Sequence, residues 1–219
     1  MRSKFYMPFV LCLVFLTLSS LKSEKKRIIF FGDSITQAGV KPNGYISKLG
    51  ETLKAPNYEL IGAGIGGNKV YDLYLRLEED VLLKKPDVVV IYVGINDVWH
   101  KSTSHTGTDY PKFINFYQAL ITKISATGSK VILCTPSVIG EKKNGENELD
   151  PELDKYADAI RELAKKNNLP LCDLRNLFKT YEETNNKDNL DKGILTTDGV
   201  HLNDLGNKFV ADNLLPFIK

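Results

Sequence analysis

Three short segments of this 219-residue chain carry side chains that can act on a carbonyl group. Ser34 and His201 supply a hydroxyl and an imidazole, which can work together as a nucleophile and its general base. Asp198, three residues before His201, can hold the imidazole in one tautomer. Asn96 carries an amide that can donate a hydrogen bond to an oxyanion. These are residue types that acyl transfer uses.

Each segment taken alone also has a purely structural interpretation. Asp33 or Ser34 can cap a helix, and Gly94 with Asn96 can form a turn. His201 can be a surface residue before a last helix whose expected cap is Asn203. The types of these residues therefore do not decide the function until their positions in the fold are considered.

Short apolar runs alternate along the chain with longer amphipathic stretches. The runs, which are expected to be strands, cover residues 27–31, 58–61, 87–93, 130–134 and 169–172. Apolar residues at helical spacing fall in 45–53, 70–83, 112–127 and 151–166, and a last helix is expected over 204–218. Strands without alternation are buried on both faces. The pattern predicts a single three-layer α/β/α domain with a flavodoxin-like, doubly wound sheet of about five parallel strands.

In such a sheet, ligands bind beyond the carboxyl ends of the strands. The Ser34 and Asn96 segments each follow a predicted strand, and the His201 segment precedes the last helix. Three polar stretches, 99–110, 141–150 and 180–192, are expected to be loops that wall a pocket there. Trp99 and Tyr110 are candidate aromatic walls for a sugar, although Trp99 could equally pack under its loop.

The loop after the second run indicates an alternative function. Gly62, Gly64 and Gly67 satisfy the G-x-G-x-x-G pattern of dinucleotide sites. That pattern normally follows the first strand, and its acidic partner lies at the end of the next one. Here the acidic cluster 78–80 falls within a predicted helix. A nucleotide- or sugar-binding module using Gly62 to Gly67 is the second hypothesis, and the other use of Gly67 is an N–H directed at the crevice of Ser34 and Asn96.

Taken in order, four blocks resemble those of the SGNH (GDSL-type) hydrolase superfamily. They are Gly32-Asp33-Ser34, Gly67, Gly94-x-Asn96-Asp97 and Asp198-x-x-His201, and the resemblance spans residues 28–205. The first block reads GDSIT rather than GDSL, a variant most similar to the small acetylhydrolase and carbohydrate acetylesterase branch.

The resemblance implies a role for each residue of the four blocks. It implies a serine esterase in which Ser34 is the nucleophile, His201 the base and Asp198 the residue that orients it. It implies an oxyanion hole formed by the N–H groups of Ser34 and Gly67 and the amide of Asn96, with Asp33, Gly94 and Asp97 in support. The expected substrate is a carbohydrate or small ester with a short acyl group, acetyl first. A lysophospholipase or thioesterase of the same family is the alternative.

The N-terminal segment has the composition of an export signal. Cations at Arg2 and Lys4 precede an apolar stretch from Phe5 to Leu18 and then small residues, which predicts a secretory signal peptide over residues 1–23 and a hydrolase domain over 24–219. An uncleaved membrane anchor is the other interpretation of this stretch. Cleavage would export the domain and leave it without stable membrane association.

Charge and cysteine content limit the partners of the mature chain. The full chain has a net charge of +2, and removing three lysine and arginine residues with the signal leaves 26 basic and 27 acidic residues. This balance gives no bulk attraction for nucleic acid. No organic cofactor is expected, and no metal, because His100 and His105 lack carboxylate partners in a ligand pattern. Cys134 and Cys172 are expected as buried residues at strand ends, with a disulfide between them as the alternative.

Overall fold

The computed structural model describes residues 25–53 and 57–219. Its five strands are β1 (Lys26–Gly32), β2 (Tyr58–Gly64), β3 (Val88–Tyr92), β4 (Lys130–Cys134) and β5 (Leu171–Cys172). All neighbouring pairs are parallel, in the order β2-β1-β3-β4-β5, which is the flavodoxin-like order. The predicted fold class is confirmed.

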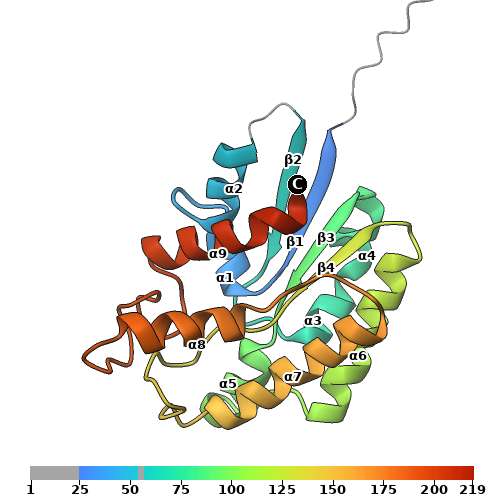
Figure 1. Ribbon diagram of the computed structural model, residues 1–219. Helices are drawn as coiled ribbons and strands as arrows, with labels where there is room; N and C mark the ends of the chain where they lie inside the picture. The colour runs from blue at the N-terminus through green and yellow to red at the C-terminus, as the bar shows by residue number, and fades with distance from the viewer. Residues whose placement is uncertain (1–24, 54–56) are drawn as a thin grey trace, which may run out of the picture.

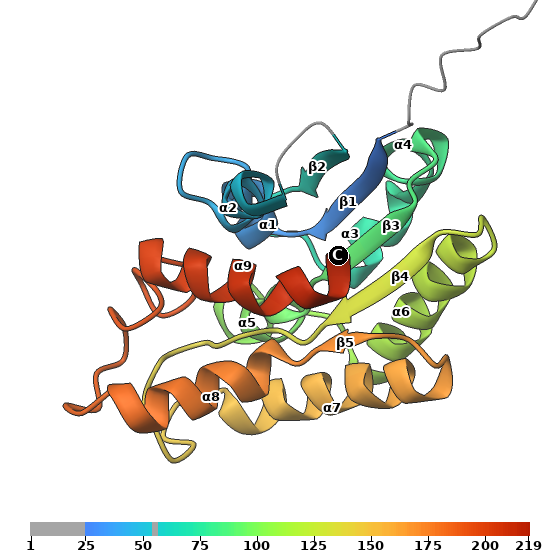
Figure 2. The ribbon, with the colours of Figure 1, turned by 45° about the horizontal axis from the view of Figure 1, so that its top comes forward.

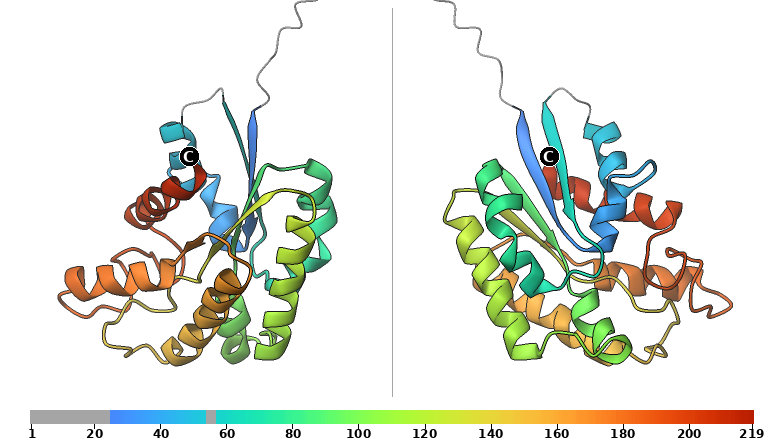
Figure 3. Two further views of the ribbon diagram at one scale, coloured as in Figure 1. Left: turned by 45° about the vertical axis from the view of Figure 1, so that its right-hand side comes forward. Right: turned by 180° about the vertical axis from the view of Figure 1, so that it is seen from behind.

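Helices cover both faces of the sheet (Figure 1). On one face lie α3 (Val70–Leu75), α4 (Leu77–Asp80), α6 (Tyr110–Ser125) and α7 (Asp150–Lys166). On the other lie α1 (Ser34–Gly39), α2 (Tyr45–Leu53), α8 (Leu174–Asn185) and α9 (Asp204–Ile218). Two short helices, α5 (Ile95–Thr103) and the 3₁₀ turn η1 (Leu82–Lys84), complete the described chain. Figure 3 shows the three layers edge-on, and Figure 2 shows α8 and α9 together on one side.

The alternation of side chains along β1 explains the two cores. Ile29 and Phe31 point into the core under α3, α6 and α7, whereas Ile28 and Phe30 point into the core under α2, α8 and α9. All four side chains are fully buried, as expected for a parallel strand covered on both faces.

Two stretches that the sequence presents as polar loops are partly helical. Residues 99–103 belong to α5, and residues 180–185 belong to α8. In α8, Leu174, Phe178 and Glu182 are buried at four-residue spacing, so the apolar face continues through a segment of polar composition. The helix expected over 70–83 is divided into α3, α4 and η1, and the first break falls at Arg76.

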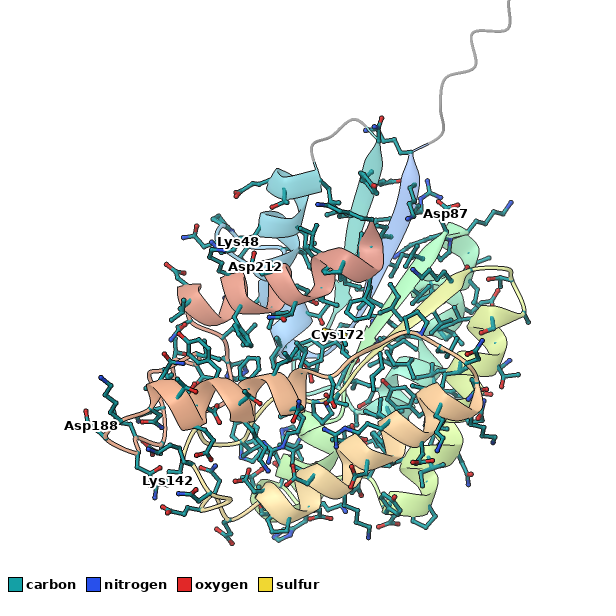
Figure 4. The ribbon with its side chains drawn as sticks, viewed as in Figure 1. Lys48, Asp87, Lys142, Cys172, Asp188 and Asp212 are labelled. Carbon is teal, nitrogen blue, oxygen red and sulfur yellow. The ribbon has the colours of Figure 1, made fainter. Side chains whose placement is uncertain are left out.

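Both cysteines of the described residues lie at strand ends, as expected. Cys134 and Cys172 are register partners at the ends of β4 and β5, and both are buried free thiols. Figure 4 labels Cys172 in the interior of the molecule. The proposed signal peptide, residues 1–23, lies outside the described residues. Within residues 25–53 and 57–219 no helix is long and apolar enough to cross a bilayer.

Candidate active site

The hydroxyl of Ser34 lies at one end of a chain of hydrogen bonds. Its Oγ is 3.0 Å from Nε2 of His201, and Nδ1 of His201 is 2.8 Å from Oδ2 of Asp198. Ser34 is the first residue of α1, separated from the end of β1 by Asp33 alone, and the other two residues lie in the loop before α9. With the Nδ1 proton directed at the carboxylate, Nε2 is free to accept the proton of the Ser34 hydroxyl.

The turn from Asp198 to His201 is held by its own aspartate. Oδ1 of Asp198 accepts hydrogen bonds from the backbone N–H groups of Val200 at 3.0 Å and His201 at 2.8 Å. Partial burial acts to raise the pKa of Asp198, but the hydrogen bonds from His201 and Val200 outweigh it and hold this pKa below its ordinary value. Asp198 therefore stays a carboxylate that faces the ring. The turn is not helical, and the side chains meet because the backbone bends back at Gly199, with φ of +95°.

Three hydrogen-bond donors are placed by the ends of β1, β2 and β3. The N–H of Ser34 begins α1, where no helical acceptor precedes it. Gly67 lies in the loop after β2 with φ of +76°, a left-handed conformation that favours glycine. Asn96, 3% exposed, donates one amide hydrogen to the carbonyl of Asn68 at 3.1 Å. An amide has two such hydrogens, so one remains available for a ligand.

The two predicted supporting carboxyl groups are buried beneath these loops. Asp33 caps the N-terminus of α1, because its side chain accepts from the N–H of Ile35 at 3.0 Å. Asp97 accepts from the N–H of Val70 with both oxygens at 3.2 Å and so joins α5 to the start of α3. Burial raises the pKa of Asp33 to about 7 and that of Asp97 to about 6. Asp33 thus stabilises the backbone at the start of α1, and Asp97 stabilises the backbone at the start of α3.

Glycine is required at Gly94 and Gly64 for different reasons. Gly94 precedes α5 as its N-cap residue with φ of +139°, which other residues rarely adopt. A Cβ on Gly64 would lie 2.2 Å from the backbone nitrogen of Gln37, so this glycine lets β2 approach α1. The dinucleotide pattern would explain Gly64 by the close approach of a ligand. Its close packing against α1 explains this glycine without a ligand.

The two residues expected to be aromatic pocket walls, Trp99 and Tyr110, lie on different helices, α5 and α6. Trp99 is half-buried on α5, packs against the core under α9 and has its ring 6.0 Å from that of His100. Tyr110 packs 5.3 Å from the ring of Tyr156 on α7. Glu141 is fully buried, so the side chain that opens the 141–150 stretch does not line an open pocket.

Two further residues lie beside the site, His100 and Arg76, and the sequence did not predict either as a site residue. Cε1 of His100 lies 3.7 Å from the position that a Cβ on Gly67 would take. Partial burial and the cation of Lys69 lower the pKa of His100 below 6.5, which favours the neutral ring. His100 lies four residues after Asn96 and so on the same face of α5. This spacing could have indicated from the sequence that the His100 ring lies near Asn96.

Arg76 joins the ends of β1 and β2 to the loop that follows β2. Its guanidinium donates to the carbonyl of Gly32 at 2.8 Å, to that of Ala63 at 3.0 Å and to Oδ1 of Asn68 at 2.8 Å. Asn68 in turn holds the amide of Asn96. Arg76 therefore ties the ends of β1 and β2 to Asn68, the residue that follows Gly67 and holds Asn96, and no local pattern in the sequence predicts this role.

Comparison with known proteins identifies the class. Residues 30–209 match the GDSL-like Lipase/Acylhydrolase family, and the chain belongs to that family. It is a carboxylic ester hydrolase, and the resemblance to the SGNH acetylesterase branch is confirmed.

Three similar proteins show how far the likeness extends. The crystal structure of the acetyl xylan esterase AlAXEase is 57% identical, with a TM-score of 0.87, and the match covers 88% of this chain and all of that one. An acetylxylan esterase of Geobacillus stearothermophilus is 29% identical over 205 residues, covering 85% of this chain and 90% of the relative. The isoamyl acetate-hydrolyzing esterase 1 homolog of Rattus norvegicus is 26% identical, covering 88% and 81%.

Proposed function

We propose that this protein is a serine esterase that removes acetyl groups from a carbohydrate or small ester through an acyl-enzyme on Ser34. The observation that carries the proposal is the continuous chain of contacts from Ser34 Oγ to His201 and on to Asp198, at 3.0 and 2.8 Å. These distances suit proton transfer from the Ser34 hydroxyl to the His201 ring. The carboxylate of Asp198 then stabilises the imidazolium that forms.

The reaction proceeds in two steps. His201 Nε2 accepts the Ser34 proton as Oγ attacks the ester carbonyl carbon, and the resulting oxyanion receives hydrogen bonds from Ser34 N–H, Gly67 N–H and the Asn96 amide. The tetrahedral intermediate collapses, His201 returns the proton to the departing alcohol, and the acyl group stays on Ser34. Water then attacks this ester in the same way, which releases the carboxylic acid and restores the hydroxyl. None of these steps requires a metal or an organic cofactor.

The proposal for the acyl group rests on the relatives. Two of them are named for acetylated xylan and one for isoamyl acetate, so the acetyl group is common to relatives whose alcohols differ. Hydrolysis of 4-nitrophenyl esters from acetate to palmitate, with acetylated xylo-oligosaccharides alongside, tests this choice. A preference for long chains would favour the lysophospholipase or thioesterase alternative.

The decisive test is Ser34→Ala with 4-nitrophenyl acetate. We expect kcat to fall by roughly 10⁴-fold or more, because the nucleophile of a triad is lost. Ser47→Ala on α2, where the hydroxyl bonds only the Val40 carbonyl at 3.1 Å, is the matched control and should keep wild-type activity. Equal rates for the wild type and Ser34→Ala would refute the mechanism.

Export of the protein is part of the same proposal. The cation and apolar pattern of residues 1–23 supports a cleaved signal peptide, which leaves one domain over 24–219. Mass spectrometry of the mature N-terminus tests it. A chain that begins at Met1 and sediments with membranes would favour the uncleaved anchor.

A further inference from the structure

The loop that carries Asp198 and His201 has little regular secondary structure of its own. Between the end of α8 and the start of α9 the assigned pairing is a single antiparallel bridge, Thr196 with Leu202. A catalytic geometry accurate to a few tenths of an ångström needs more support than a turn supplies.

That support comes from the buried carboxylate of Glu141, in the loop between β4 and α7. Its Oε1 accepts from the N–H of Leu195 at 2.6 Å and of Thr196 at 2.8 Å, and its Oε2 accepts from the N–H of Ile194 at 2.8 Å. Glu141 is 0% exposed, so water does not compete for these bonds. Three consecutive backbone donors thus converge on one negative charge.

The backbone around Glu141 holds the same loop at two further points. The N–H of Glu141 donates to the Asp191 carbonyl at 3.0 Å, and the N–H of Gly140 donates to the Gly199 carbonyl at 2.8 Å. Gly199 lies between Asp198 and His201. Figure 4 shows the two loops side by side, with Lys142 labelled on one and Asp188 on the other.

Short contacts connect the residues bound by Glu141 to the proposed catalytic pair. Oγ1 of Thr196 accepts from the N–H of Gly199 at 3.0 Å, and the N–H of Thr197 donates to the His201 carbonyl at 2.8 Å. A shift of Leu195 and Thr196 would therefore move the turn that places the imidazole beside Ser34.

We propose that Glu141 is a positioning residue for the reaction, whose carboxylate fixes residues 194–196 and through them the alignment of His201 with Ser34. The inference rests on the proposed function, because it assigns Glu141 a role through His201. Removing the carboxylate leaves three buried N–H groups without an acceptor, and the loop must relax to satisfy them. Displacement of a catalytic group by about 1 Å can cost about 100-fold in rate.

Glu141→Gln tests the inference with little change in shape. The amide oxygen can still accept two N–H groups, but its NH₂ would face the third donor. A residue that serves only stability would lower the number of folded sites without changing the rate at each one. The assay therefore reports kcat per active site, with sites counted by exhaustive reaction with a 4-nitrophenyl organophosphate that releases one nitrophenolate per competent serine.

We expect kcat per site of Glu141→Gln to fall by about 10- to 100-fold, with KM for 4-nitrophenyl acetate changed little. Glu182→Gln is the matched control, because Glu182 is also a buried carboxyl, 2% exposed, but does not bond to residues 194–196. It should keep the wild-type kcat per site at pH 7. If Glu141→Gln yields too little folded protein, Thr196→Val removes the acceptor of the Gly199 N–H while leaving the bonds to Glu141 intact, and should also lower kcat per site.

Ser34→Ala, assayed alongside, separates the two ideas. If it is inactive while Glu141→Gln and Thr196→Val keep the wild-type kcat per site, the role of Glu141 is refuted and the serine mechanism stands. If Ser34→Ala is as active as the wild type, the mechanism itself is refuted, and the role of Glu141 is refuted with it.

Discussion

The reactivity proposed for Ser34 depends on the groups that surround its hydroxyl. The imidazole of His201 approaches at 3.0 Å, and the carboxylate of Asp198 fixes the other side of the ring. Asn96, the proposed side-chain donor to the oxyanion, shows the same dependence on its surroundings. Its amide is nearly buried, and the bond to the Asn68 carbonyl restricts its rotation before any substrate arrives. Donors oriented in advance do not have to reorganise during the reaction.

Asn96→Ala therefore should affect the transition state more than the bound substrate. We expect kcat to fall by about 10²- to 10³-fold with little change in KM, the loss typical of one oxyanion donor. Steady-state kinetics with 4-nitrophenyl acetate measure both constants. Asn185→Ala, an exposed asparagine on α8 that donates to the Tyr181 carbonyl, should behave as the wild type. A rise in KM with kcat unchanged would remove Asn96 from the oxyanion hole.

At the scale of elements, a parallel sheet gathers the ends of β1, β2 and β3 at one edge, but it does not fix the loops beyond them. Arg76 joins the ends of β1 and β2 to the loop after β2, and Asp97 joins α5 to α3. The break between α3 and α4 falls at Arg76, whose guanidinium reaches back to the strand ends and lies 4.6 Å from the ring of Phe31.

Arg76→Lys should loosen the loops that carry the proposed oxyanion donors. The ammonium of a lysine cannot reproduce the planar guanidinium, whose N–H groups reach Gly32, Ala63 and Asn68 together. Each buried acceptor left unpaired costs about 1–3 kcal/mol of folding free energy. We expect a lower Tm and a kcat reduced about tenfold or more, measured by thermal unfolding and ester hydrolysis.

Arg161→Lys provides the matched control for that change. Arg161 bridges Asp158 and Asp173 between α7 and the start of α8, and its hydrogen bonds go to these two residues rather than to the four blocks. It should leave kcat unchanged. A wild-type kcat in folded Arg76→Lys would show that the sheet alone positions the loops.

At the scale of the whole molecule, the stability of the fold should depend on pH through a buried carboxyl far from the proposed nucleophile. Glu182 is 2% exposed, and its Oε1 has no partner among the described residues. Burial, together with the negative charge of Glu141, raises the pKa of Glu182 from 4.5 to about 8. In this interval the folded protein holds a proton that the unfolded chain has released, so the contribution of Glu182 to stability is complete below pH 4.5 and is lost as the pH rises to 8.

Glu182→Gln should remove this dependence. The wild type loses stability over this interval and the variant does not. We therefore expect the Tm difference, variant minus wild type, to increase from pH 5 to about 8 and then to level off, whether it is positive or negative at pH 5. Thermal unfolding across that range measures the difference. Glu183→Gln, an exposed neighbour on α8, controls for the substitution itself. A difference that stays constant with pH would contradict the raised pKa.

Periodicity was enough to predict the sheet, because each strand contains a local apolar run that can be found without knowledge of its neighbours in the fold. Predictions were wrong where the composition of a segment and its packing disagree. The 180–185 segment is polar, yet its helix continues because Glu182 points inward in register with Phe178. The glutamate that opens the 141–150 stretch was expected in a pocket wall but is buried, because its hydrogen-bond partners lie in a loop far along the chain.

The residue types of the four blocks and their order along the strands were therefore readable from the amino acids alone, and family membership followed from them. The approach of His201 to Ser34, 167 residues apart, was decided only by the packed molecule, as were the links made by Arg76 and Glu141. Apolar patterning acts between near neighbours in sequence. Hydrogen bonds across long separations form only where the packing of the two cores brings donor and acceptor within about 3 Å.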